Sequence, residues 1–262
     1  MNTRPTEPAM HNGIRYIIYT YEKFKEEDDV RLRVVEAAGK YLKILEESFK
    51  KIVDVGWKRV PDEGIVMTHC HSNTVTAILV KAFEEGKKFK VISSETRPLY
   101  QGRKTTEELA EAGIKVYHIV DSAMRWAARK FKPDIAIIGS DAISSTGVVI
   151  NKIGSKLLAL VAKEFDFPLY VASTLLKLDI SSLLGDYIHI EMRSPNEIWP
   201  NIPEEIKKNV EILNPAFETV APEFIDGIIS EAGIIRPEIA LLTFKETYPE
   251  IWSVVSKKLH SL

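Results

Sequence analysis

The chain has 262 residues, of which 45% are hydrophobic and 27% are charged, and its formal net charge is −2. This apolar fraction is that of a soluble globular protein and excludes wholesale disorder. No apolar run reaches the roughly 18–20 residues that span a bilayer, and residues 1–13 lack the apolar core of a signal peptide. We therefore expect a cytoplasmic protein. The near-neutral charge gives no broad basic field, so neither nucleic acid nor a membrane is the expected partner.

Two residue counts narrow the chemistry further. The single cysteine, Cys70, excludes an intrachain disulfide and a cysteine-rich zinc site. The single glutamine, together with many lysines and glutamates, is typical of a thermophile, whereas the eight asparagines argue the other way.

The first part of the chain is predicted to be a helical region covering residues 1–60. Between residues 30 and 55, apolar residues recur at spacings of three and four, which is typical of a helix with one apolar face. These apolar residues are Leu32, Val35, Ala38, Leu42, Leu45, Phe49 and Ile52. Residues 14–21 are rich in β-branched and aromatic residues and fit either a short strand or the start of a helix. A connection is predicted around Pro61.

The remainder, residues 61–262, is predicted to be one Rossmann-like α/β domain. Short apolar strands alternate with helical segments, which indicates a parallel sheet with helices on both faces. The strands are expected at 65–67, 89–92, 116–120, 135–138 and 169–172, and the helices between them at 73–85, 105–112, 122–130 and 153–165. A tail follows, with helices expected at about 222–231 and 237–259.

Several predicted strands end in small or polar residues. These groups are Thr68-His69-Cys70, Ser93-Ser94-Glu95, Asp121-Ser122, Gly139-Ser140-Asp141 and Ser173-Thr174. Ligands of parallel α/β sheets bind at the carboxyl ends of the strands. We therefore expect these groups to converge on one edge of the sheet.

Cys70 and Asp141 are the candidates for proton transfer at this edge. Cys70 precedes a predicted helix, whose dipole would lower the pKa of the thiol, and protonated His69 and His71 would add to that effect. The alternative is that Cys70 is a small buried residue, as free cysteines often are. Asp141 follows Gly139 at a strand tip and can exchange a proton with a substrate, although aspartate also caps helices and turns. Together, a thiol and a carboxylate at neighbouring strand tips suggest an acid–base pair.

Three cations are expected at the same edge. Arg97 has a planar donor fork suited to phosphate or carboxylate, Lys152 stands at the start of a long predicted helix where an anion is favoured, and Lys177 follows the last predicted strand. Each could instead be an ordinary solvated cation. With Cys70 and Asp141 nearby, they suggest an anionic small molecule as the ligand.

Neither a metal nor a dinucleotide is expected. His69 and His71 have no third clustered ligand, which disfavours a metal site. The glycines between residues 139 and 147 fit neither the dinucleotide fingerprint nor a phosphate-binding loop. The sequence therefore predicts no cofactor.

Several motifs occur in an order that resembles one protein family. They are Met67-Thr68-His69-Cys70-His71-Ser72, Glu95-Thr96-Arg97-Pro98 with Gln101-Gly102, Gly139-Ser140-Asp141-Ala142-Ile143, Asn151-Lys152-Ile153-Gly154, and Asn214-Pro215-Ala216-Phe217 with Pro222-Glu223-Phe224-Ile225-Asp226 and Gly233-Ile234-Ile235. The chain resembles, from about residue 62 to residue 237, the family that unites three groups. These are the α/β/δ regulatory subunits of eukaryotic translation initiation factor 2B, ribose-1,5-bisphosphate isomerase and methylthioribose-1-phosphate isomerase.

The resemblance implies roles for individual residues. In the isomerases of the family, the cysteine of the His-Cys motif and the aspartate of the Gly-x-Asp motif form the catalytic pair, and Cys70 and Asp141 match them. The substrate contacts that carry over are Ser72, Asn73, Thr74, Asn151, Lys152 and Lys177. The residue after Asp141 is Ala142 and not an arginine. In this respect the chain is more similar to the ribose-bisphosphate branch than to the methylthioribose branch.

Two hypotheses for the function follow. The first is an aldose–ketose isomerase for a phosphorylated pentose, with ribose 1,5-bisphosphate as the expected substrate, and Cys70 favours it. The second is a non-catalytic sugar-phosphate or nucleotide sensor, or an initiation-factor-2B-like subunit with initiation factor 2 as partner. The sequence lacks the Arg-Gly-Ala motif that helps the isomerases bind phosphate, which favours the second hypothesis. The resemblance also implies a homo-oligomer, for which the aromatic residues of the tail are candidates (Phe217, Phe224, Phe244, Tyr248 and Trp252).

Overall fold

A computed structural model describes residues 7–185 and 190–256. In this part of the chain, the centre of the molecule is a seven-stranded sheet in the order β11-β10-β7-β4-β1-β2-β3. Its strands are β1 (Ile65–Thr68), β2 (Lys90–Ser94), β3 (Lys115–Ile119), β4 (Ile135–Ile138), β7 (Leu169–Ala172), β10 (Gly227–Ser230) and β11 (Gly233–Ile235). All neighbours pair in parallel except β10 and β11, which are antiparallel. The five predicted strands and the predicted α/β class are confirmed.

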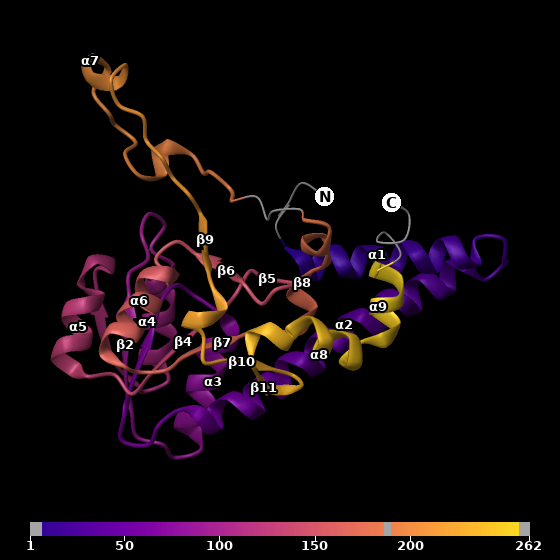
Figure 1. Cartoon of the computed structure of the whole chain (residues 1–262), viewed down its shortest axis with the longest axis horizontal. Helices are drawn as coiled ribbons and strands as arrows, with labels where there is room; N and C mark the ends of the chain where they lie inside the picture. The colour runs from indigo at the N-terminus through magenta and orange to yellow at the C-terminus, as the bar shows by residue number, and fades with distance from the viewer. Residues whose placement is uncertain (1–6, 186–189, 257–262) are drawn as a thin grey trace.

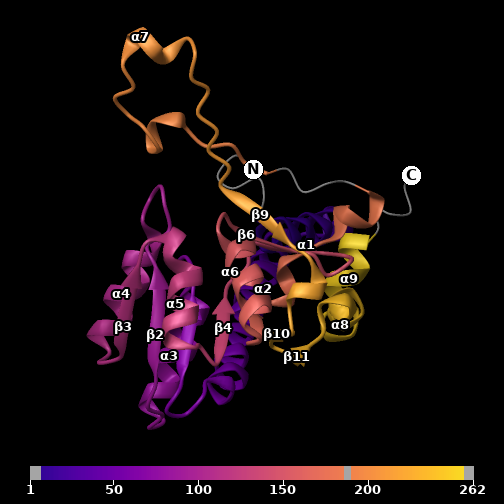
Figure 2. The ribbon, with the colours of Figure 1, turned by 60° about the vertical axis from the view of Figure 1, so that its left-hand side comes forward.

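Helices cover both faces of this sheet (Figure 2). They are α3 (Asn73–Glu84), α4 (Gln101–Glu111), α5 (Met124–Phe131) and α6 (Ser155–Phe165). Side chains of a strand alternate between the two faces. Met67 and Ile138 are fully buried in one core with α5 and α6, while Val66 and Ile137 are fully buried in the other with α3 and α4. These two cores explain why the strands are nearly continuous apolar runs.

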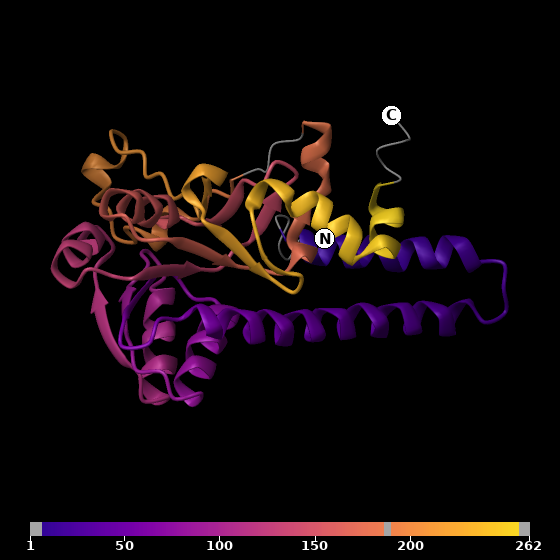
Figure 3. The same cartoon turned by 60° about the horizontal axis from the view of Figure 1, so that its bottom comes forward.

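Two long helices form an antiparallel hairpin that extends beyond the sheet (Figure 3). They are α1 (Pro8–Phe24) and α2 (Val30–Gly56), so residues 14–21, which the sequence left undecided, are helical. The apolar face expected for α2 is only partly covered, because α1 packs on a face that includes Ala37 and Tyr41. Leu42 on the expected face is 61% exposed. The hairpin shares a core with the sheet, so the two parts are packed together. The domain boundary at residue 60 therefore stays a prediction.

A second, smaller sheet was not predicted from the sequence. Its order is β8-β5-β6-β9, with β5 (Ala142–Ser144), β6 (Val149–Lys152), β8 (Leu178–Asp179) and β9 (Phe217–Val220). β5 follows β4 almost directly and folds back as an antiparallel hairpin with β6. This hairpin places Asp141 at its start and Lys152 at its end, so the small sheet positions two of the predicted site residues.

The tail differs from the prediction of helices at 222–231 and 237–259. Residues 227–230 form β10, because a run buried on both sides fits an inner strand. The second predicted helix is divided into α8 (Ala240–Thr247) and α9 (Pro249–Val255), since Pro249 begins a new helix. The remaining residues of that prediction, 257–259, lie outside the described residues. Phe244 is fully buried against Tyr248 and Trp252, so these aromatics complete the core of the chain itself.

An extended arm, residues 191–216, projects from the body, with the short helix α7 (Glu204–Lys207) near its tip (Figures 1 and 2). Its base is held by backbone hydrogen bonds from Arg193 N–H to the Asn214 carbonyl and from Ala216 N–H to the Glu191 carbonyl. Short 3₁₀ helices connect several elements; they are Trp57–Arg59, Asp121–Ala123, Leu175–Lys177, Ile180–Leu184, Pro195–Glu197, Pro222–Phe224 and Pro237–Ile239. Among the described residues, we find no helix with the length and apolar character needed to cross a membrane.

Candidate active site

A pocket of about 570 Å³ lies where β1 and β4 end and the small sheet begins. The site residues expected from the sequence that line it are Cys70, Ser72, Asn73, Thr74, Asp141, Asn151, Lys152 and Lys177. Its other lining residues are Phe49, His71, Gln101, Gly139, Ser140, Arg193 and Phe217. Of the five strand-end groups expected to converge, those after β1 and β4 line this pocket, whereas those after β2, β3 and β7 do not. The pocket holds a thiol, a carboxylate and two lysines.

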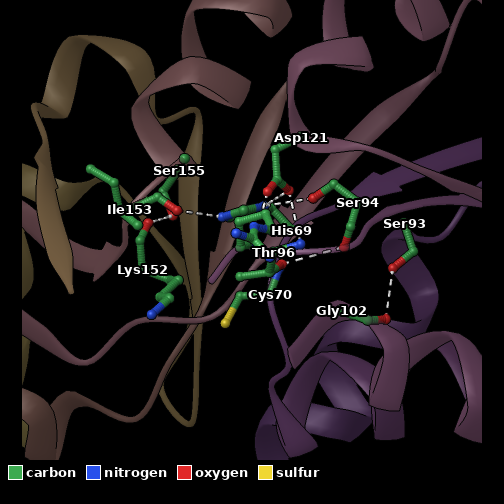
Figure 4. Close-up of polar contacts among 12 residues, drawn as sticks. His69, Cys70, Ser93, Ser94, Thr96, Gly102, Asp121, Lys152, Ile153 and Ser155 are labelled. Carbon is green, nitrogen blue, oxygen red and sulfur yellow. Dashed lines mark hydrogen bonds and ion pairs between the residues drawn. The ribbon is translucent and has the colours of Figure 1, made fainter. Parts of the chain in front are cut away.

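Cys70 is held at the tip of β1 in a left-handed backbone conformation, with φ at 66°. Its N–H donates to Thr96 Oγ1 at 3.0 Å, and its carbonyl accepts from Thr105 Oγ1 at 2.9 Å. These two hydrogen bonds hold the backbone of Cys70 in place. One partner belongs to the loop after β2 and the other to helix α4. Figure 4 shows the Cys70 sulfur and the Lys152 ammonium pointing to the same side of the site.

The pKa of the Cys70 thiol is raised to about 11, mainly because burial disfavours the thiolate. The His71 backbone N–H and the charge of Lys152 act in the opposite direction, while Asp141 adds to the rise. The prediction of a lowered pKa is wrong. Helix α3 begins three residues later, capped by the Ser72 side chain, and burial outweighs the effects that favour the thiolate.

His69 connects the tip of β1 to the segment that carries Lys152. Its Nε2 lies 2.7 Å from the Ile153 carbonyl and its Nδ1 lies 2.6 Å from Ser94 Oγ (Figure 4). A carbonyl can only accept, so Nε2 carries the proton and Nδ1 accepts from the Ser94 hydroxyl. Burial lowers the pKa of His69, which keeps the ring neutral. His69 is therefore not the cationic neighbour of Cys70 that the sequence suggested.

His71 lines the pocket, and both of its ring nitrogens have partners. Its Nδ1 is 3.1 Å from Thr105 Oγ1, and its Nε2 is 2.8 Å from Asn73 Oδ1. Because the Thr105 hydroxyl donates to the Cys70 carbonyl and an amide oxygen can only accept, both ring nitrogens of His71 face hydrogen-bond acceptors. Across the described residues, no group of three or more His, Cys, Asp or Glu side chains is arranged to hold a metal ion.

Asp141 and Lys152 are brought together by the β5–β6 hairpin. The Asp141 N–H donates to the Ile150 carbonyl at 2.8 Å, which ties the start of β5 to β6. Lys152 is only 4% exposed, and burial lowers its pKa, whereas the nearby Cys70 and Asp141 favour its charge. Asn151 donates to Ser155 Oγ at 2.8 Å, so its amide is oriented by the first residue of α6.

The start of α6 is not free for a substrate anion. Glu218 Oε1, on β9, accepts hydrogen bonds from the N–H groups of Gly154 and Lys156. A carboxylate of the protein thus occupies the positive end of this helix dipole. The prediction that Lys152 stands at a helix start where an anion can bind is therefore corrected. Only the ammonium group of Lys152, and not the start of α6, faces the pocket.

Lys177 and Arg97 differ in their relation to the pocket. Lys177 Nζ donates to the Ser140 carbonyl at 2.6 Å and lies 3.8 Å from Glu7 Oε1, so its charge is partly compensated. The Arg97 side chain stacks on Tyr100 and lines a separate cavity of about 270 Å³ below the arm. Its backbone N–H donates to the Asp121 carboxylate at 2.7 Å, which fixes this part of the loop. The structure does not bring Arg97 to the pocket of Cys70.

Comparison with known proteins identifies the family. The model of the initiation factor 2 subunit family matches residues 1–237. The chain belongs to this family. It is 39% identical over 254 residues to ribose 1,5-bisphosphate isomerase of Pyrococcus furiosus, covering 94% of this chain and 77% of that protein. It is 34% identical over 252 residues to methylthioribose-1-phosphate isomerase of Carboxydothermus hydrogenoformans, covering 90% and 72%.

A solved structure agrees with this assignment to the initiation factor 2 subunit family. The translation initiation factor eIF-2B of Pyrococcus horikoshii superposes with a TM-score of 0.74 at 31% identity, covering 89% of this chain and 77% of that one. The family that the sequence motifs indicated is therefore confirmed.

Four pocket residues of this family member were not singled out from the sequence as site residues: Phe49, Gln101, Arg193 and Phe217. Gln101 and Phe217 belong to motifs that carried the resemblance, so they could have been found there. Phe49 was assigned only to the apolar face of a helix. Arg193 belongs to the arm, a segment without periodicity, and no signal in the sequence places it beside Lys152.

Proposed function

We propose that this protein is an aldose–ketose isomerase that acts on a phosphorylated pentose, with ribose 1,5-bisphosphate as substrate. The observation that carries the proposal is that the Cys70 thiol, the Asp141 carboxylate and the Lys152 ammonium line one pocket and act on one another electrostatically. Relatives that match 90% or more of this chain bear the names of sugar-phosphate isomerases, which supports the same conclusion.

In the proposed reaction, Cys70 donates a proton and Asp141 accepts one. The raised pKa of the thiol keeps it protonated at neutral pH, so it can protonate the ring oxygen as the bond from C1 to that oxygen breaks. Asp141 takes the proton of the C2 hydroxyl while the hydrogen on C2 moves with its electron pair to C1. C2 becomes a ketone, C1 is reduced, and the proton returns from the carboxyl group to the thiolate through water.

The rest of the pocket is proposed to bind the substrate. Lys152 and Lys177 supply positive charge for phosphate, and Ser72, Asn73 and Thr74 at the start of α3 supply hydroxyl and amide groups. Because the substrate is oxidised at one carbon and reduced at the next, the reaction balances without an external oxidant. The proposal therefore assigns no redox cofactor.

The test is turnover of ribose 1,5-bisphosphate by the purified protein, followed by phosphorus NMR. We expect ribulose 1,5-bisphosphate to form, and we expect Cys70→Ser and Asp141→Asn each to lower kcat by about 100- to 10,000-fold. Lys208→Gln, at an exposed residue near the tip of the arm, serves as the control and should leave kcat unchanged. Turnover by a folded Cys70→Ser variant at the wild-type rate would refute the assignment of the pair.

A second candidate is a non-catalytic subunit similar to initiation factor 2B. It is favoured by the solved structure of that name, which shares 31% identity with this chain. If it holds, the purified protein should show no isomerase activity and should retain initiation factor 2 on an affinity column prepared from cells that express both. Failure to retain that factor, together with isomerase turnover, would exclude this candidate.

A further inference from the structure

The base of the arm presents an arginine to the pocket. Arg193 donates its backbone N–H to the Asn214 carbonyl at 2.8 Å, and Met192 bridges to Pro215 across the two sides of the arm. The Asn214 side chain in turn donates to the Ser194 carbonyl at 2.9 Å. The backbone on both sides of Arg193 is therefore fixed, and a fixed backbone reduces the entropy lost when a side chain binds a ligand.

The side chain of Arg193 lines the pocket, and one of its donors has no hydrogen-bond partner. Its Nε is shielded from solvent and has no hydrogen-bond partner. Glu191 Oε1 lies 3.5 Å from that Nε, close enough for attraction between charges but without the geometry of a hydrogen bond. A buried donor without an acceptor is unfavourable, and a guanidinium provides a planar fork suited to two oxygens of one anion.

Arg193 also acts on Lys152 across the same pocket. Its charge lowers the pKa of Lys152, second in effect to burial among the causes that lower it. Two cations that repel each other at one cavity are stabilised when an anion binds between them. Lys177, the other lysine of the pocket, already has the Ser140 carbonyl and Glu7 as partners, whereas no hydrogen bond satisfies Nε of Arg193.

We propose that Arg193 binds a phosphate group of the substrate together with Lys152, and so forms an anion subsite at the base of the arm. This inference rests on the proposed function, since it names a substrate-binding residue of the same pocket. It also assigns a cation for phosphate to a chain that lacks the Arg-Gly-Ala motif.

The test compares binding of inorganic phosphate and of ribose 5-phosphate by calorimetry in three variants. Arg193→Gln should weaken binding of both by about 10- to 100-fold, because a charge-assisted hydrogen bond is lost. Arg193→Lys, which keeps the charge without the fork, should weaken it less. The matched control is Glu191→Gln, which removes the neighbouring carboxylate and should leave binding unchanged or tighten it. Thermal unfolding of each variant checks that the chain remains folded.

Kinetics separate this inference from the proposed function. If wild type converts ribose 1,5-bisphosphate, Arg193→Gln should raise KM by about tenfold or more and change kcat less. An active wild type with the same KM and the same phosphate affinity in Arg193→Gln would overturn the subsite and leave the isomerase intact. An inactive wild type whose phosphate affinity still depends on Arg193 would overturn the isomerase and leave the subsite intact.

Discussion

At the scale of single residues, the proposed chemistry depends on Cys70 keeping its proton. The pKa of the thiol is raised to about 11 by burial, so little thiolate exists at neutral pH. We expect alkylation by iodoacetamide to be slow at pH 7 and its rate to climb up to about pH 11. Asp141→Asn should speed alkylation at a given pH, because the carboxylate contributes to the raised pKa. A rate that levels off by about pH 8, near the ordinary thiol pKa of about 8.5, would contradict this picture.

The same residue shows what a sequence can predict about a site. The motifs placed Cys70 and Asp141 at strand tips, and the parallel sheet brings both to one pocket, since its strand ends share an edge. The pKa of the thiol was predicted with the wrong sign, because burial depends on how the loop after β2 and helix α4 close over the tip. The position of Arg97 was also beyond prediction, because a side chain on a loop can point toward the pocket or away from it.

At the scale of elements, the start of helix α6 is stabilised by a carboxylate from β9. Glu218 accepts from the N–H groups of Gly154 and Lys156, so Glu218→Gln should lower the free energy of unfolding by about 1 kcal/mol. Urea unfolding at pH 7 measures this change. Thr219→Ala, at the exposed neighbour on the same strand, is the control. Equal stability of wild type and Glu218→Gln would show that the carboxylate contributes nothing to the helix.

The elements that the sequence predicted are those with a clear apolar run or a helical period. Parallel strands buried on both faces and amphipathic helices between them were found within a few residues of their ends. The strands of the small sheet have two to four residues, too short for a period to be visible, and β8 and β9 join the β5–β6 hairpin from far along the chain. The small sheet that positions Asp141 and Lys152 was therefore the part of the site that needed the structure.

At the scale of the whole molecule, the arm is the feature that a single chain does not explain. Met192, Trp199 and Leu213 on the arm are 53%, 42% and 64% exposed. Large apolar side chains exposed along one projecting segment suggest an interface. The aromatics of the tail, by contrast, are mostly used in the core of the chain. We propose that the arm packs on a second copy of the chain, which would place the base that carries Arg193 beside an interface.

Sedimentation velocity at micromolar concentrations tests this assembly. We expect the wild type to sediment as a dimer or a larger homo-oligomer, and Trp199→Glu combined with Leu213→Glu to shift it toward the monomer, because charges on a buried apolar surface are costly. Lys208→Gln, also on the arm, should sediment as wild type does. If the monomer is catalytically weaker and its KM is higher, the arm base depends on the second copy for its position. A wild type that remains monomeric would contradict this assembly.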